Sequence, residues 1–263
     1  MARSALLNVM VAAAMKAGRG LSRDFGEVQN LQVSMKGPGD FVSSADRRAE
    51  DVIRTELQRA RPDYGLLMEE SGTIEGRDKQ HRWIVDPLDG TTNFLHGIPI
   101  FAISIALERE GQIVAGVIYN PAMDELYTAE RGQGAFLNDR RLRVAGRREL
   151  SQCVIGTGIP HLGRGNHGKF LEEMRLVMRE VSGIRRMGAA ALDLAYIAAG
   201  RLDGFWEQNL SAWDIAAGIL MVREAGGYVS DLTGGATMLE SGQICAGNET
   251  VHRTLIDLLA KAG

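Results

Sequence analysis

Cysteine is scarce in this sequence. Its two cysteines, Cys153 and Cys245, lie far apart and form no Cys-x-x-Cys pair. The scarcity argues against a disulfide framework and a cysteine-rich zinc site, and it favours a reducing, cytoplasmic compartment. A surplus of basic residues is also lacking, since the formal net charge is −3 at pH 7. Because general nucleic-acid binders usually carry such a surplus, we do not expect that class of protein.

Long hydrophobic runs are absent as well. No stretch reaches the roughly 18 apolar residues that a membrane span requires, so we expect no membrane partner. The apolar residues 6–14 after Arg3 imitate a short signal peptide, but Asn8 interrupts them. One face of a helix would collect the apolar side chains Leu6, Leu7, Met10, Val11 and Ala14. We therefore expect an N-terminal amphipathic helix and no cleaved signal.

The first half of the chain predicts two helices followed by a sheet. A second helix should begin at the polar residues 43–46, carry apolar residues at helical spacing, and end at Pro62. Short runs rich in branched and aromatic residues then predict strands at 66–68, 83–85, 101–107, 113–119, 126–128 and 135–137. Glu110-Gly111 predicts a hairpin turn between two of them, so we expect a mostly antiparallel sheet.

The second half alternates strands and helices. An arginine-rich stretch, 140–148, marks the boundary between the two halves. Strands are expected at 154–155, 205–206 and 244–245, and helices at 170–181, 189–199, 215–225 and from 249 onward. Gly226-Gly227 closes the third of these helices. We expect stacked layers in two subdomains: an α+β subdomain (1–148) that carries metal-binding motifs, and an α/β subdomain (149–263) that completes the site.

The segment 83–93 carries the strongest chemical signal. An apolar strand ends at Asp86, Pro87 interrupts the ladder of backbone hydrogen bonds, and residues 89–92 look like the start of a helix. Asp86 and Asp89 would project into one small space, where a divalent metal relieves their mutual repulsion. The N–H groups of Gly90 and Thr91 would form an anion site beside it. This combination favours phosphoryl transfer; the alternative is an ordinary turn and helix cap.

Further carboxylates support the metal interpretation. Glu69-Glu70 follows a strand, Asp46 lies in the first turn of a helix, and Asp214 precedes an apolar helix. Each has a plainer interpretation as compensation of a helix dipole or as a solvated end, which is most credible for Asp46 and Glu70. Oxygen ligands without a histidine or cysteine cluster favour Mg²⁺ over zinc. The five histidines, His81, His96, His161, His167 and His252, show no ligand spacing.

Two signatures then identify a resemblance. The first reads Trp-Ile-Val-Asp-Pro-Leu-Asp-Gly-Thr-Thr-Asn-Phe over residues 83–94, and the second runs from Trp213-Asp214 to Gly226-Gly227. Shorter matches lie at 42–46, 68–71 and 186–190. Over nearly the whole chain, the sequence resembles the inositol monophosphatase family, close to its bacterial branch. The resemblance implies a five-layer α-β-α-β-α sandwich of the sugar-phosphatase type, a homodimer, and two to three Mg²⁺ per site.

The resemblance also implies roles for individual residues. Metal would be held by Glu69, Asp86, the Leu88 carbonyl, Asp89 and Asp214, and Glu69 would also touch a third, looser ion. Phosphate would be bound by Gly90 and Thr91. The hydroxyl groups of a small phosphorylated polyol would be contacted by Asp89, Gly188, Ala190, Glu207 and Asp214. Lys36 matches a lysine near the site, and Asp46 would pair with Thr91.

The expected reaction is hydrolysis of a phosphate monoester by in-line attack of a metal-activated water. Thr91 with Asp46, or Glu69, would orient that water or take its proton, and a second metal would stabilise the leaving alkoxide. Inositol monophosphate is the expected substrate. Two departures from the family pattern, Ile159 and Ala189 in place of hydroxyl-bearing residues, make the chemistry a firmer inference than the substrate.

Two alternatives stay open at this point. The same chemistry could serve fructose 1,6-bisphosphate, histidinol phosphate or a nucleotide 3′-phosphate. The main role could instead be binding to the transcription machinery, through basic surfaces formed by Arg140, Arg141, Arg143, Arg147 and Arg148, or by Arg185 and Arg186. We prefer a solvated region or a dimer contact for these arginines, because charged runs are usually surface features.

Overall fold

The computed structural model describes residues 3–28, 33–37, 40–163 and 165–262, with residues 33–37 and 40–43 described for the backbone alone. The helices are α1 (Ala5–Phe25), α2 (Ser44–Ala60), α3 (Thr91–Leu95), α4 (His167–Met178), α5 (Ala190–Ala198), α6 (Ala212–Glu224), α7 (Met238–Ser241) and α8 (Glu249–Leu259). Among the described residues, 3₁₀ turns lie at Leu150–Gln152 and Ala260–Ala262.

The strands of the described residues form three sheets. A two-stranded sheet pairs β1 (Val33–Gly37) with β2 (Asp40–Ser43). The eight-stranded sheet contains β3 (Tyr64–Met68), β4 (Gly72–Ile74), β5 (Asp78–Asp89), β6 (Ala102–Arg109), β7 (Gln112–Asn120), β8 (Glu125–Glu130), β9 (Gly134–Leu137) and β10 (Arg140–Arg141), in the order β10-β9-β8-β7-β6-β5-β3-β4. The five-stranded sheet contains β11 (Val154–Thr157), β12 (Gly183–Arg185), β13 (Gly204–Glu207), β14 (Tyr228–Ser230) and β15 (Ile244–Gly247), in the order β12-β11-β13-β15-β14.

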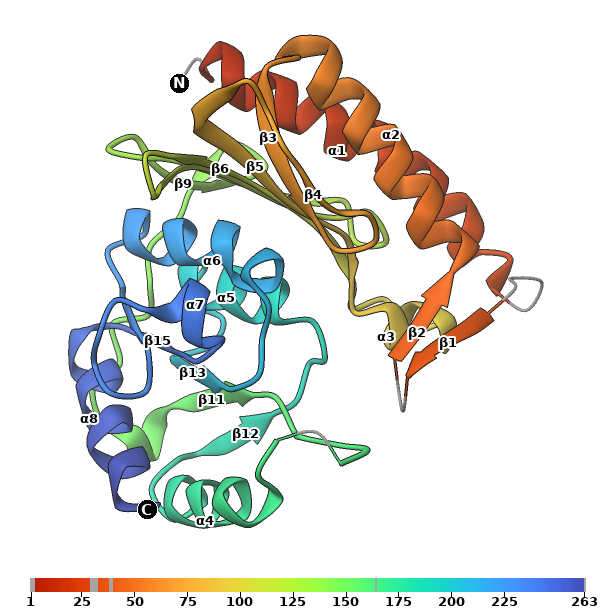
Figure 1. Cartoon of the computed structure of the whole chain (residues 1–263). Coiled ribbons are helices and arrows are strands. Elements are labelled where there is room, and N and C mark those ends of the chain that lie inside the picture. Colours follow the sequence, from red (N-terminus) through yellow and green to blue (C-terminus); the bar gives the residue numbers. More distant parts are fainter. Residues whose placement is uncertain (1–2, 29–32, 38–39, 164, 263) are drawn as a thin grey trace.

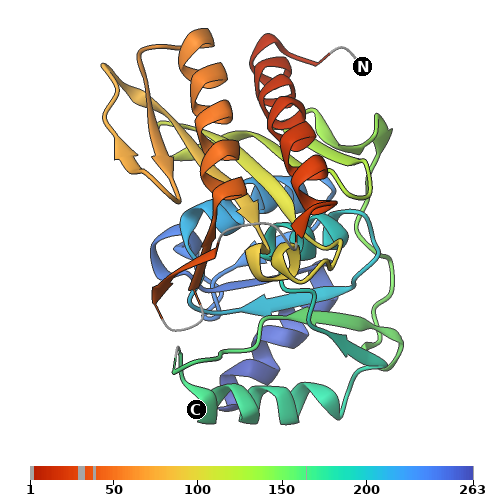
Figure 2. The ribbon, with the colours of Figure 1, turned by 90° about the vertical axis from the view of Figure 1, so that its right-hand side faces the viewer.

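These elements stack as five layers, which confirms the predicted α-β-α-β-α sandwich (Figure 1). Helices α1 and α2 cover the outer face of the eight-stranded sheet, and α5 and α6 lie between the two larger sheets. Helices α4 and α8 cover the far face of the five-stranded sheet. In the view of Figure 2, α1 and α2 run side by side at one end of the molecule and α4 and α8 lie at the other.

Alternating side chains in the strands explain why both sheets are buried on both faces. In β5, Trp83 and Val85 pack toward α1 and α2, whereas Ile84 between them packs toward α5 and α6. In β13, Phe205 faces α5 and α6 while Trp206 faces α4 and α8. Each of these strands therefore joins two hydrophobic cores, which holds the layers in fixed order.

The predicted amphipathic helix at the N-terminus is confirmed as α1. Ser4 caps it by accepting a hydrogen bond from the N–H of Leu7 at 3.1 Å. Its apolar face packs on the eight-stranded sheet, and Lys16 Nζ lies 2.6 Å from Glu56 Oε1 on α2. None of the helices among the described residues is both long and apolar enough to cross a membrane.

The predicted hairpin is confirmed, but the predicted end of one strand is wrong. Glu110 and Gly111 join β6 to β7, and both have positive φ angles, 51° and 74°. Strand β5 does not stop at Asp86. It continues to Asp89 across a bulge, because Asp86 pairs with Ser104 and Asp89 with Ala102. Pro87 is tolerated there since a bulged residue owes no N–H to the ladder.

Two helix starts also differ from the prediction because polar residues cap them earlier. Asn166 accepts from the N–H of Lys169 at 3.0 Å, so α4 begins at His167 and ends at Met178, short of residue 181. Ser211 caps α6, so this helix begins at Ala212 and Asp214 lies in its first turn. All strands of the eight-stranded sheet precede residue 148 and all strands of the five-stranded sheet follow it. The division into two subdomains at that point stays a prediction.

Candidate active site

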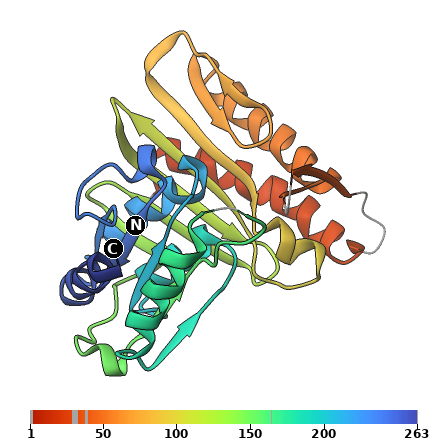
Figure 3. The same ribbon diagram turned by 60° about the horizontal axis from the view of Figure 1, so that its bottom comes forward.

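A cleft of about 260 Å³ lies where the ends of β5, β11 and β13 meet the N-termini of α5 and α6. Its lining comprises Asp89, Gly90, Thr91, Thr92, residues 158–161, Asn166, Phe170, Glu173, Arg186, residues 188–190, residues 206–210 and Asp214. Figure 3 shows the ribbon with the bottom of the molecule turned forward. Segments far apart in the sequence therefore build one site.

Three aspartates meet at this cleft. Carboxylate oxygens of Asp86, Asp89 and Asp214 all lie within 4.8 Å of one another. Asp86 is 2% exposed, and the other two are half-buried. Such a group of hard oxygen donors, without histidine or cysteine, suits a divalent cation such as Mg²⁺.

Backbone contacts hold each of these carboxylates in place. Asp86 Oδ1 accepts the N–H of Leu88 at 2.8 Å, which follows from the bulge in β5. Asp89 Oδ2 accepts the N–H of Ala191 at 2.7 Å, at the start of α5. Asp214 Oδ2 accepts the N–H of Ser211 at 2.6 Å as part of a capping box. The aspartates are thus fixed before any ligand arrives.

The electrostatics of the group favour a bound cation. Burial, and then the charges of Glu69, Asp89 and Asp214, raise the pKa of Asp86 well above its ordinary value. Burial and the charge of Asp214 do the same for the pKa of Asp89. Burial raises the pKa of Asp214 to about 6, against the opposing hydrogen bonds from Ser211 and with Asp86. A divalent cation would remove this repulsion, so the residues present fit a metal.

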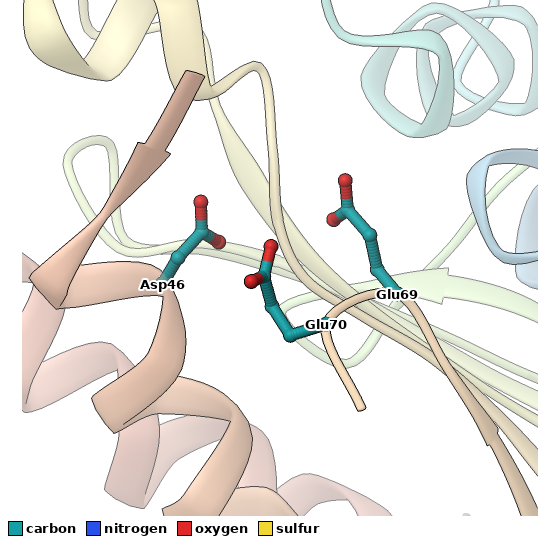
Figure 4. A group of neighbouring side chains, drawn as sticks. All are labelled: Asp46, Glu69 and Glu70. Carbon is teal, nitrogen blue, oxygen red and sulfur yellow. The ribbon is translucent and has the colours of Figure 1, made fainter. Parts of the chain in front are cut away.

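A second acidic group adjoins the first. Oxygens of Asp46, Glu69 and Glu70 also lie within 4.8 Å of one another. In Figure 4, Asp46 extends from the first turn of α2 toward Glu70, while Glu69 extends from the segment that follows β3. The backbone N–H of Glu70 is accepted by Glu50 Oε2 at 2.8 Å, and Arg47 Nε lies 3.8 Å from Glu70 Oε2.

Glycine at position 90 shapes the opening of the cleft. Its φ is +89°, and a Cβ there would meet the Ile100 carbonyl oxygen at 2.9 Å. Glycine is therefore required here, because a side chain would be strained at this φ and would collide with the neighbouring backbone. Thr91 Oγ1 lies 3.2 Å from Asp46 Oδ2 and 2.9 Å from the Leu88 carbonyl oxygen.

Glu207 forms the opposite wall. It ends β13 and packs directly on Gly158, where any Cβ would collide with its carboxylate. Burial, and then the charge of Asp214, raise the pKa of Glu207 to about 8, while the Arg186 guanidinium opposes the shift. Gly188 and Ala190 line the same side of the cleft.

The structure places most of the predicted site residues around one centre. The cleft is lined by Asp89, Gly90, Thr91, Gly188, Ala190, Glu207 and Asp214, and the two acidic groups include Asp46, Glu69 and Asp86. The Leu88 carbonyl adjoins them, since it accepts the Thr91 hydroxyl. Ile159 and Ala189, the two departures from the family pattern, also line the cleft. Lys36 belongs to β1, and its side chain lies outside the described residues.

Several residues of the site were missed from the sequence. Glu70 was interpreted there as a solvated end, yet it belongs to an acidic group. Glu173 and His161 line the cleft, and Asp193 is a buried carboxyl close to Glu207. The adjacency of Glu70 to Glu69 was an available signal. The others stand in segments whose local pattern shows only an ordinary helix or loop.

Comparisons with known proteins agree with this geometry. The family model of the Inositol monophosphatase family matches residues 2–263. The chain is 75% identical to "Inositol-1-monophosphatase" of Mesorhizobium japonicum, covering 99% of this chain and 98% of that protein. It is 46% identical to "Nus factor SuhB" of Pseudomonas aeruginosa, covering 95% and 94%. The crystal structure of extragenic suppressor protein suhB from Bartonella henselae superposes with a TM-score of 0.96 at 67% identity, covering 98% and 99%.

Proposed function

This chain belongs to the inositol monophosphatase family of metal-dependent phosphatases, and we propose that it hydrolyses inositol monophosphate to inositol and phosphate with Mg²⁺ as cofactor. The observation that carries the proposal is the group formed by Asp86, Asp89 and Asp214 beside a glycine-shaped opening. The name of the relative from Mesorhizobium japonicum, which is 75% identical, supports the substrate.

The acidic residues are proposed to hold two to three Mg²⁺ ions. Glu69, Asp86 and the Leu88 carbonyl would take one, and Asp86, Asp89 and Asp214 a second. When bound, the ions would neutralise the carboxylates, lower the pKa of a water molecule and stabilise charge on the reacting oxygens. Glu69 is also suited to a third, looser ion, since it belongs to the group with Asp46 and Glu70.

The phosphate group is proposed to bind at Gly90 and Thr91. Both residues line the cleft at the start of α3, where their backbone N–H groups would donate to phosphate oxygens. The Thr91 hydroxyl would orient the attacking water and pass its proton toward Asp46, whose Oδ2 lies 3.2 Å away. Glu69 is the alternative base. The side chains of this protein would thus orient the attacking water and accept its proton.

The ring of the substrate is proposed to lie against the opposite wall. Glu207 would accept hydrogen bonds from ring hydroxyls, and Asp89, Gly188, Ala190 and Asp214 would complete the contact. Ile159 and Ala189 replace polar groups in this region, so the ring is recognised chiefly through carboxylates. A polyol suits this arrangement, because each of its hydroxyls can donate a hydrogen bond to them.

A substrate panel tests this assignment. Phosphate release would be measured from inositol 1-phosphate, fructose 1,6-bisphosphate, histidinol phosphate and a nucleotide 3′-phosphate under identical conditions with Mg²⁺. We expect the highest kcat/KM for inositol 1-phosphate. A higher value for another ester would retain the chemistry and replace the substrate.

A second role in transcription is favoured by one comparison. The relative from Pseudomonas aeruginosa is named a Nus factor. Arg140, Arg141 and Arg143 are exposed beside one another, whereas Arg147 is held by Asp203 at 2.6 Å. A pull-down of transcription complexes with wild type and the Asp89→Asn variant would separate the roles. Binding retained by the variant would be independent of catalysis, and no binding by either would reject this role.

A further inference from the structure

Glu173 is a carboxylate in the wall of the cleft that the proposed reaction does not use. It lies in the middle of α4 and its residue is 0% exposed. Its Oε2 accepts the indole N–H of Trp206 at 3.2 Å, and its Oε1 accepts the side-chain amide of Gln208 at 2.8 Å. Both of its oxygens therefore have neutral donors from a single segment.

Burying a carboxylate with neutral partners is costly, so packing alone does not explain it. An apolar residue at this position of α4 would fill the space and spare the desolvation. Burial raises the pKa of Glu173, and the hydrogen bond from Trp206, the charge of Lys169 and the hydrogen bond from Gln208 oppose that shift. Unlike an apolar side chain, the carboxylate accepts the two hydrogen bonds from Trp206 and Gln208.

The two donors flank Glu207, the residue proposed to accept the substrate hydroxyls. Strand β13 ends at Glu207, and Asn209 beyond it has a φ of +63°. The backbone thus leaves the sheet at the point where Glu207 enters the cleft. Before that point, Thr157 Oγ1 holds the Trp206 carbonyl at 2.9 Å. After it, the Glu173–Gln208 hydrogen bond ties the segment to α4.

The direction of the Glu207 side chain is sensitive to this tether. Glu207 packs against Gly158 with no room for even one additional carbon atom. A small displacement of residues 206–208 would therefore move the carboxylate along or away from the cleft wall. Hydrogen bonds to charged groups depend steeply on distance and angle, so recognition of hydroxyls would weaken.

We propose that Glu173 is a positioning residue: through Trp206 and Gln208 it aims the Glu207 carboxylate at the hydroxyl groups of the substrate. This inference rests on the proposed function, because it assumes that Glu207 binds those hydroxyls. It assigns to α4, which carries none of the family signatures, a part in substrate specificity.

The test compares wild type with Glu173→Gln on two esters. Inositol 1-phosphate offers ring hydroxyls, and phenyl phosphate offers none. Glutamine keeps the shape but can satisfy only one of the two donors, so kcat/KM for inositol 1-phosphate should fall about 10-fold, chiefly through KM. Hydrolysis of phenyl phosphate should change far less.

A swap variant provides the matched control. In Glu173→Gln/Gln208→Glu, the amide at 173 can donate to the new carboxylate at 208 while its oxygen still accepts from Trp206. This variant should recover most of the lost kcat/KM. Equal losses on both esters, no loss in the single variant, or no recovery in the swap would overturn the positioning role.

A Glu207→Gln variant separates this inference from the proposed function. It should also lose activity selectively on inositol 1-phosphate. If it does and Glu173→Gln does not, the positioning role alone is wrong. If Glu207→Gln shows no selectivity, or wild type releases no phosphate from inositol 1-phosphate, the proposed substrate contacts are wrong and this inference fails with them.

Discussion

When divalent cations are removed by a chelator, the stability of the folded protein should fall as pH rises. The reason is the acidic group at the cleft, whose carboxyls bind protons more tightly in the folded chain than in the unfolded chain. For such an acid, the free energy of unfolding decreases as pH rises from the ordinary pKa to the raised pKa. Asp214 titrates near 3.8 when unfolded and at about 6 when folded, so this loss is complete slightly above pH 6.

The magnitude follows from the shift of the pKa. For Asp214 the displacement corresponds to on the order of 3 kcal/mol of unfolding free energy. For a chain of this size, that amount moves Tm by about 6–12 °C. Glu207, whose pKa is raised from 4.5 to about 8, extends the fall in the same direction to higher pH. Bound Mg²⁺ would replace the protons, so the stabilisation that it provides should grow with pH.

Thermal unfolding measures this directly. Tm would be recorded from pH 5 to pH 8 with EDTA and with saturating Mg²⁺, for wild type and Asp214→Asn. The variant should show a flatter pH dependence in EDTA and a smaller increase with Mg²⁺. Asp139→Asn, at a side chain that is 78% exposed, is the matched control and should behave as wild type. An increase with Mg²⁺ that is independent of pH, or equal in Asp214→Asn, would refute the reasoning.

Three other predictions follow from single contacts. Thr91→Val removes the hydroxyl that faces Asp46 and should lower kcat at least about 100-fold in a phosphate-release assay, whereas Thr91→Ser should retain most of it; equal rates would contradict the proton route. Gly158→Ala would displace the Glu207 carboxylate and should raise KM for inositol 1-phosphate, and an unchanged KM would argue against Glu207 as a contact. Asp193→Asn replaces a 1% exposed carboxyl with a raised pKa and should increase Tm at pH 7, with a decrease as the contrary result.

Local chemistry made much of the fold predictable. The hairpin at Glu110-Gly111 and the strand at residues 83–85 depend on turn propensity and apolar patterning, which are written in adjacent residues. The bulge at Pro87 was not predictable, because it depends on how β6 pairs alongside β5. Short strands such as β12 and β14 were missed for the same reason, since only their neighbours in the sheet stabilise them.

The candidate site divides in a similar way. Asp86 and Asp89 belong to the signature at residues 83–94, and Asp214 belongs to the signature that begins at Trp213. The sequence therefore already suggested that these three aspartates act together. Glu173 and Asp193 lie in helices whose pattern is that of any packed helix. Their significance comes from contacts across the five-stranded sheet, which no local pattern records.

The most direct test of the central claim is phosphate release from inositol 1-phosphate by wild type and Asp89→Asn, with and without Mg²⁺. The asparagine keeps an oxygen that can accept the N–H of Ala191, now 2.7 Å from Asp89, so the fold should be preserved while a metal ligand is lost. We predict release that requires Mg²⁺ in wild type and is abolished in the variant. Release without a divalent cation, or undiminished release by Asp89→Asn, would contradict the account.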